Sequence, residues 1–174
     1  MTTKQLPVYA MPKLKSFLEQ NGPWSQLVSQ QNIQIQTLSD NQAIRLGDSI
    51  SVTPLIVPHR DEYSETVGYI ISGPSKKLLF IPDIDKWEKW SQNINRLIEK
   101  VDYALIDATF FDAAEINNRP ISEIPHPLVV ESMDRFKSTP LKDKQKIHFI
   151  HFNHTNPLIN NKSIATEKVI KAGF

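Results

Sequence analysis

The sequence predicts a layered α/β or α+β domain, for three reasons. Apolar runs alternate with segments of helical spacing from residue 66 to residue 172, which favours helices packed on a sheet rather than a bundle. The part before residue 66 is richer in strand-like runs. Twelve prolines and only five glycines stand mainly at the joints between segments, where turns are expected. We therefore expect the 174 residues to form a single domain large enough to bury a core.

The first part of the chain is expected to form two helices and then strands. A helix is predicted over residues 12–20, with Pro12 in its first turn and Asn21-Gly22 at its end. A shorter helical segment follows over residues 24–31. Alternation of apolar and polar residues then predicts strands over residues 33–38, 43–46 and 49–57.

The second part is expected to alternate strands with helices. Gly73-Pro74-Ser75 lies between two apolar runs and indicates a hairpin turn. Asp85 stands where it can cap a helix over residues 87–99, whose apolar residues have helical spacing. Further strands are predicted over residues 66–72, 77–81, 103–106 and 147–152, and further helices over residues 127–136 and 164–172.

Composition narrows the range of functions. A formal net charge of +1, with no block of like charges, gives no electrostatic reason to expect binding to nucleic acid or to a membrane surface. A small-molecule substrate is the expected partner. The chain shows no signal-peptide pattern and no apolar run of membrane-spanning length, so a cytoplasmic location is expected. Because there is no cysteine, histidine and carboxylate side chains must bind any metal.

Potential metal ligands follow three of the predicted strands. His59 ends one run, Asp83 ends the run of residues 77–83, and His151 and His154 lie at the end of the last one. Imidazole together with carboxylate suits zinc, iron or manganese better than calcium. Taken alone, His59 also fits a surface histidine, and Asp83 fits a turn or cap residue. The pair His151 and His154 is more specific, because a histidine buried in an apolar strand needs a partner.

Three further residues have roles that the sequence leaves open. His148 has the opposite strand face from His151 and is assigned a structural role. Asp107 ends a strongly apolar strand, so its carboxylate needs a histidine, a hydroxyl or backbone amides, and it could orient a ligand histidine. His126 lies between two prolines just before a predicted helix. It is either a plain loop histidine or an acid or substrate clamp, and we treat His126 and Asp107 as catalytic candidates.

Several segments resemble the metallo-beta-lactamase superfamily, most closely its pyrroloquinoline quinone synthesis protein B group. They are VPHRDEYSETVGYIISG, KLLFIPDID, YALIDATFFDAAEI, IPHP and KIHFIHFNHTNPLINNKS. The resemblance implies an αββα sandwich that binds one or two metal ions, usually zinc, and activates water for hydrolysis. It places His59 at the middle histidine ligand, Asp83 at the bridging aspartate and His151 at the last ligand, with His126 near the substrate.

The chain also departs from the family pattern. The superfamily's main ligand motif, His-x-His-x-Asp-His, is absent, and no histidine precedes His59. Both ends look cut, so we expect an incomplete sandwich that lacks the N-terminal part and an incomplete metal site. Such a fragment would expose an apolar face, and the purified chain is expected to be unstable or to form homo-oligomers.

Three functions therefore remain open at this stage. The first and preferred one is a metal-dependent hydrolase that acts on an ester, amide or phosphodiester, inactive as this chain alone. The second is a non-hydrolytic role in cofactor biosynthesis, as the quinone-synthesis resemblance suggests. The third is a binding remnant without chemistry. In the quinone-synthesis group the positions of His59 and Asp83 are variable and asparagine replaces His154, so keeping these residues favours the hydrolase.

Overall fold

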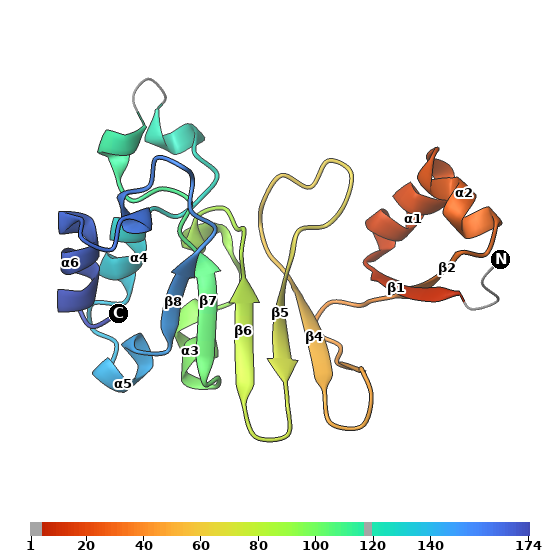
Figure 1. Cartoon of the computed structure of the whole chain (residues 1–174), viewed down its shortest axis with the longest axis horizontal. Coiled ribbons are helices and arrows are strands. Elements are labelled where there is room, and N and C mark those ends of the chain that lie inside the picture. Colours follow the sequence, from red (N-terminus) through yellow and green to blue (C-terminus); the bar gives the residue numbers. More distant parts are fainter. Residues whose placement is uncertain (1–4, 117–119) are drawn as a thin grey trace.

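The central feature of the computed structural model, which describes residues 5–116 and 120–174, is a six-stranded mixed sheet (Figure 1). Its strand order is β3-β4-β5-β6-β7-β8. Pairing is antiparallel from β3 to β6 and parallel from β6 to β8. The strands are β3 (Ile44–Arg45), β4 (Ser51–Ile56), β5 (Val67–Ser72), β6 (Lys77–Ile81), β7 (Tyr103–Asp107) and β8 (Ile147–Ile150).

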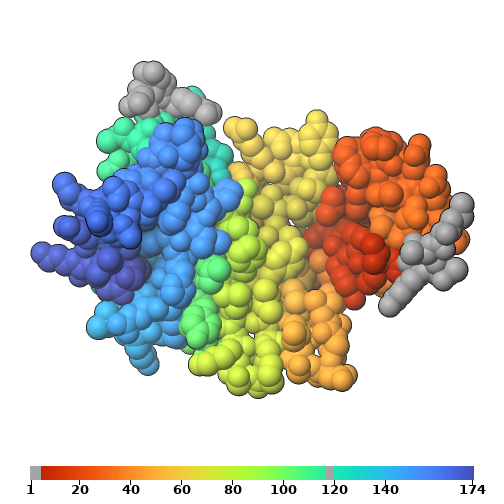
Figure 2. Space-filling model, viewed as in Figure 1, coloured from red at the N-terminus to blue at the C-terminus, as the bar shows by residue number. Residues whose placement is uncertain are grey.

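A second, two-stranded parallel sheet lies near the N-terminus. It pairs β1 (Leu6–Ala10) with β2 (Ile33–Thr37), and the connection between them carries α1 (Pro12–Gln20) and α2 (Trp24–Ser29). Figure 2 shows these red and orange elements packed on the β4 side of the molecule. One contact there is a hydrogen bond of 2.7 Å from the Ile56 backbone N–H to Asp40 Oδ1.

The remaining helices are grouped near the other strands of the main sheet. In Figure 1, α4 and α6 lie beside the β8 edge and α3 lies behind β6 and β7. No helix in the described part of the chain is long and apolar enough to cross a lipid bilayer. The helices are α3 (Ile94–Glu99), α4 (Val129–Arg135), α5 (Leu141–Lys144) and α6 (Ile164–Lys171), with 3-10 turns at Trp87–Lys89, Ala113–Glu115, Ile121–Glu123 and Pro157–Ile159.

The main core joins the sheet to α3 and to the segment before it. Leu79, Ile81 and Ile106 from the strands are buried together with Ile94 and Ile98 from α3. Each side chain of this size contributes roughly 1.5–3 kcal/mol when it is fully buried. The alternating apolar residues of β6 and β7 thus hold the sheet rigidly beneath the helices, and this fixes where those strands end.

Most of the predicted elements are confirmed. The α/β class, the helix over residues 12–20, the strand over residues 77–81 and the hairpin around residues 73–75 appear as expected. Strand β1 and helix α5 were not predicted. β1 contains a proline and is mostly exposed, so it lacks the clear alternation by which a strand is recognised.

The predicted helix over residues 87–99 is wrong, because the segment is split in two. Trp87 and Trp90 are both buried, and their indole N–H groups donate to Ser132 Oγ and to the Ile56 carbonyl, at 2.9 and 2.8 Å. The helix α3 begins only after Asn93, whose side chain accepts hydrogen bonds from the N–H groups of Asn95 and Arg96. The burial and hydrogen bonding of the two indoles therefore determine the backbone here, although the apolar residues have helical spacing.

Asp85 consequently does not cap α3. Its carboxylate accepts hydrogen bonds from Lys86 N–H and from Lys89 Nζ, both at 2.7 Å. Burial alone would raise the pKa of Asp85, but these two hydrogen bonds outweigh it and hold that pKa below its ordinary value. Asp85 therefore stabilises the turn that follows Asp83.

Four strands of the main sheet point in the same direction. β6, β7 and β8 are parallel, and β4 runs the same way because it lies two antiparallel steps from β6. Their carboxyl ends therefore meet at one edge of the sheet. His59, Asp83, Asp107 and His151 all lie at or just beyond these ends. The topology brings together residues that lie far apart in the sequence.

Candidate metal centre

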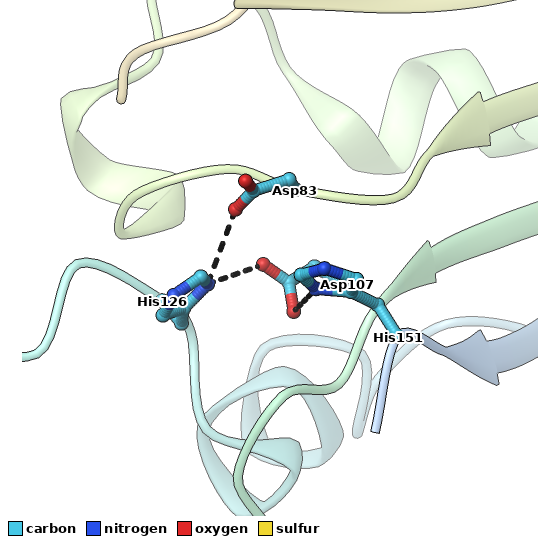
Figure 3. Close-up of side chains that lie close together, drawn as sticks. All are labelled: Asp83, Asp107, His126 and His151. Atoms are coloured by element: carbon cyan, nitrogen blue, oxygen red, sulfur yellow. Dashed lines mark hydrogen bonds and ion pairs between the residues drawn. The ribbon is translucent and has the colours of Figure 1, made fainter. Parts of the chain in front are cut away.

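Four side chains converge at this edge of the sheet (Figure 3). Asp83, Asp107, His126 and His151 each offer one potential ligand atom, and these atoms all lie within 4.8 Å of one another. Asp107 is the last residue of β7, Asp83 and His151 follow β6 and β8, and His126 comes from the loop before α4. Figure 3 shows the His126 ring to one side of the two carboxylates, with its Nδ1 facing both. Imidazole and carboxylate ligands at this spacing form a candidate metal-binding group.

Asp107 lies at the bottom of this group and is completely buried. Its Oδ2 accepts a hydrogen bond from Ile84 N–H at 3.1 Å and lies 2.8 Å from His126 Nδ1. Its Oδ1 accepts from both the N–H and the Oγ1 of Thr109, at 2.8 and 2.7 Å. With two donors on each oxygen, the carboxylate is fully engaged and holds the His126 ring in place.

Thr109 links Asp107 to both histidines, and the sequence did not identify it. Its hydroxyl donates to Asp107, and its oxygen lies 3.2 Å from His126 Nδ1 and 3.0 Å from His151 Nδ1. Thr109 thus lies against both imidazole rings and holds them next to the buried carboxylate. The signal in the sequence was a hydroxyl two residues after a buried aspartate.

Asp83 is bonded very differently. Its Oδ1 is buried, lies 2.7 Å from His59 Nε2 and 3.3 Å from His126 Nδ1, and yet makes no hydrogen bond with suitable geometry. His59 Nδ1 is also buried without a hydrogen-bond partner. Buried polar atoms are normally paired. Close, unpaired ligand atoms of this kind fit a metal ion, which would satisfy the carboxylate oxygen.

His151 has a left-handed backbone conformation with φ of 66°. This ends β8 at Ile150, so the predicted strand over residues 147–152 is too long. The prediction that His151 is buried within a strand is also wrong, because its side chain remains 45% exposed. The left-handed conformation costs a residue with a side chain roughly 1–2 kcal/mol. Strain of this kind is concentrated at functional sites.

We expect the strain at His151 to be measurable with two substitutions. Both His151→Ala and His151→Gly remove the imidazole, but only glycine adopts the left-handed conformation without strain. In the presence of a chelator, the glycine variant should be more stable than the alanine variant by roughly 1 kcal/mol. Urea denaturation of the two variants measures this difference. Equal stability would show that the backbone at this position is not strained.

The group opens into a surface pocket of about 390 Å³. Asp83, His126 and His151 line it together with His59, and Phe110, Ile124 and Pro125 form an apolar side. Thr109 and Arg60 complete the lining. The pocket therefore combines ligand-type side chains, an apolar wall and one cationic residue.

The structure brings five of the six predicted site residues together. His59, Asp83, Asp107, His126 and His151 lie at this edge of the sheet, although His59 is not among the four converging residues. His154 is exposed in the turn beyond β8 and lies outside the group. His148 is exposed on β8 and is not among the converging residues.

Asn156, in the quoted segment KIHFIHFNHTNPLINNKS, fixes the chain near the site. It is buried, and its Nδ2 donates to the carbonyl oxygens of Ala108 and Thr109, at 2.7 and 3.3 Å. Asn153 N–H also donates to Thr109 O at 2.9 Å. The loop after β8 is thus tied to the strand that carries Asp107.

The fold is that of a metallo-beta-lactamase. Residues 1–152 match the family model of the beta-lactamase superfamily domain. The chain belongs to the beta-lactamase superfamily. Among curated proteins it is similar to the coenzyme PQQ synthesis protein B of Nitrosococcus oceani, with 30% identity over 134 residues, which is 71% of this chain and 42% of that protein.

Solved structures of the same fold support this assignment. The zinc-bound PqqB from Methylobacterium extorquens has a TM-score of 0.76 at 20% identity, over 98% of this chain and 62% of that one. The metallo-beta-lactamase fold protein YhfI from Bacillus subtilis has a TM-score of 0.64 at 13% identity, over 98% of this chain and 60% of that one. The predicted metallo-beta-lactamase fold and PqqB-like character are therefore confirmed. The chain spans less than two thirds of the length of each of these relatives.

Proposed function

We propose that this chain takes part in metal-dependent hydrolysis of a small ester, amide or phosphodiester, with zinc bound by Asp83, His59 and His151, which line the same pocket. The observation that carries the proposal is the buried Asp83 Oδ1, which lies close to two imidazoles and has no hydrogen bond. Zinc binding to the PqqB of Methylobacterium extorquens supports the choice of metal. Bound zinc would supply Lewis acidity, which polarises the bond to be broken and makes water more acidic.

The protein side chains have separate roles in this proposal. Asp107 holds His126 through Nδ1, so the opposite ring nitrogen can give or take a proton at the substrate. Thr109 orients His151 in the same way. The side chains of Phe110 and Ile124 line the pocket and offer an apolar surface to the substrate. Asp107 is thus a positioning residue, and His126 is the candidate acid or base.

Hydrolysis assays with and without metal test the proposal. The chain is freed of metal with a chelator and reloaded with zinc, and hydrolysis of p-nitrophenyl acetate and bis(p-nitrophenyl) phosphate is followed. We expect turnover only after reloading with zinc. The Asp83→Asn variant should lose this activity, whereas the control His154→Ala should keep it. Turnover that persists in the chelator, or in Asp83→Asn, would contradict the proposal.

A second candidate is a non-hydrolytic role in cofactor biosynthesis. The identity of 30% with a coenzyme PQQ synthesis protein B favours it. The two candidates differ in their chemistry, because a biosynthetic oxygenase would consume oxygen and use a redox-active metal. Iron in the purified protein together with oxygen uptake would support this role, whereas zinc-dependent ester cleavage supports the first.

A further inference from the structure

We propose that Arg60 makes the pocket selective for small anionic substrates, in which a carboxylate or phosphate is attached to an apolar group. The inference rests on the proposed function, since it defines the substrate class of the same site. Arg60 is exposed and lines the pocket together with Asp83, His126 and His151. It is the only lysine or arginine among the described residues that line this pocket.

The guanidinium of Arg60 is free to bind a ligand. Within the described residues, its side chain forms no ion pair with any carboxylate, although acidic residues follow it in the sequence. The nearest of these, Asp61, is paired with Lys13 Nζ at 3.1 Å. Glu65 accepts from the Lys13 backbone N–H at 3.0 Å. These contacts direct Asp61 and Glu65 towards Lys13, and the exposed Glu62 forms no ion pair with Arg60 within the described residues.

The backbone around Arg60 is held in place. Asp85 N–H donates to the Pro58 carbonyl at 2.7 Å, and Val57 N–H donates to the Thr66 carbonyl at 3.0 Å. Thr66 Oγ1 also donates to the carbonyl of Arg60 itself, at 3.5 Å. The base of the side chain is therefore positioned at the pocket before a ligand arrives, which lowers the entropy lost on binding.

The charge balance makes anion binding depend on the metal. Asp83 and Asp107 together bring two negative charges to the site, and these repel an anion when no cation is present. A divalent cation would cancel these two charges. With neutral imidazoles, Arg60 then leaves the pocket with a net positive charge. The planar guanidinium of Arg60 can form two parallel hydrogen bonds to a carboxylate or a phosphate.

The rest of the ligand is defined by the apolar side of the pocket. Phe110, Ile124 and Pro125 line that side. The Phe110 ring lies edge-on to His126, with ring centroids 6.2 Å apart, and offers a surface against which a ring or short chain can pack. A pocket of about 390 Å³ accommodates a small molecule rather than a polymer. Phenyl phosphate and benzoate have this combination of groups.

Calorimetric titration of the zinc-loaded chain tests the inference. Phenyl phosphate, benzoate and the neutral benzamide are titrated into the wild type, Arg60→Gln and the control Arg96→Gln, which removes the same charge from an exposed position on α3. Loss of a charge-assisted contact should weaken binding of an anion by about tenfold or more. We expect this loss for phenyl phosphate, benzoate or both in Arg60→Gln, with Arg96→Gln and benzamide binding unchanged.

Each outcome is decisive. A loss confined to phenyl phosphate assigns the site to phosphates, and a loss confined to benzoate assigns it to carboxylates. Equal anion affinity in the wild type and Arg60→Gln, or an equal loss in Arg96→Gln, overturns the role of Arg60 while leaving the metal site intact. If the wild type retains no zinc, the proposed function fails and this inference fails with it.

Discussion

Replacing Asp107 with asparagine should lower the free energy of unfolding by about 3 kcal/mol, the effect of breaking a buried charged network. Both carboxylate oxygens face donors: Ile84 N–H on one side and the Thr109 N–H and hydroxyl on the other. In either orientation of the asparagine amide, its NH₂ group faces a backbone N–H. Because NH₂ cannot accept a hydrogen bond, that N–H loses its partner. The melting temperature should fall by roughly 6–12 °C, measured in a chelator so that metal binding does not contribute.

Asp102→Asn is the matched control for this experiment. Asp102 also accepts from a backbone N–H, that of Lys77, and pairs with Lys76 Nζ at 2.8 Å. Its side chain, however, is 34% exposed, so water can replace what is lost. The control should destabilise the chain far less than Asp107→Asn. An equal loss in both variants would mean that burial at Asp107 is not what matters.

Asp83→Ala should have the opposite signature, with a large loss of zinc affinity and little change in stability. The buried Oδ1 of Asp83 has no hydrogen bond to lose, whereas a metal ion would be its natural partner. Removing a ligand should weaken zinc binding by at least about 100-fold, more than the usual loss on removing a residue that only supports a ligand. The unfolding free energy in a chelator should stay within about 1 kcal/mol of the wild type.

Competition with a chromophoric chelator measures the zinc affinity, and urea denaturation measures the stability. His154→Ala is the control, because His154 lies in the same chain region as His151 but outside the converging group. A strong loss of stability in Asp83→Ala would show that the carboxylate is structural. Unchanged zinc affinity in that variant would remove Asp83 from the site.

The position of the site could be predicted from the sequence because it follows from strand ends. Apolar runs predicted β6, β7 and β8, and a potential ligand stands at the end of each of them. Asp83, Asp107 and His151 therefore emerged as candidates without any knowledge of the fold. His126 was less certain, because a loop histidine acquires its partners only through tertiary packing.

The finer geometry could not be predicted, because it depends on contacts between distant residues. Thr109 gains its role from His126 and His151, which lie far from it in the sequence. The left-handed conformation of His151 is unfavourable for a non-glycine residue, so local preference pointed to a continuing strand. His154 looked equivalent to His151 in the sequence, and only the turn after β8 separates them.

The metal content of the chain is the most direct test of a metal centre at this edge of the sheet. Wild type and Asp83→Ala are stripped with a chelator, reloaded with zinc, passed over a desalting column and analysed for bound metal by elemental analysis. We expect the wild type to retain at least one equivalent of zinc and Asp83→Ala to retain almost none. A wild-type chain without bound zinc, or the same zinc content in both proteins, would contradict a metal centre at Asp83.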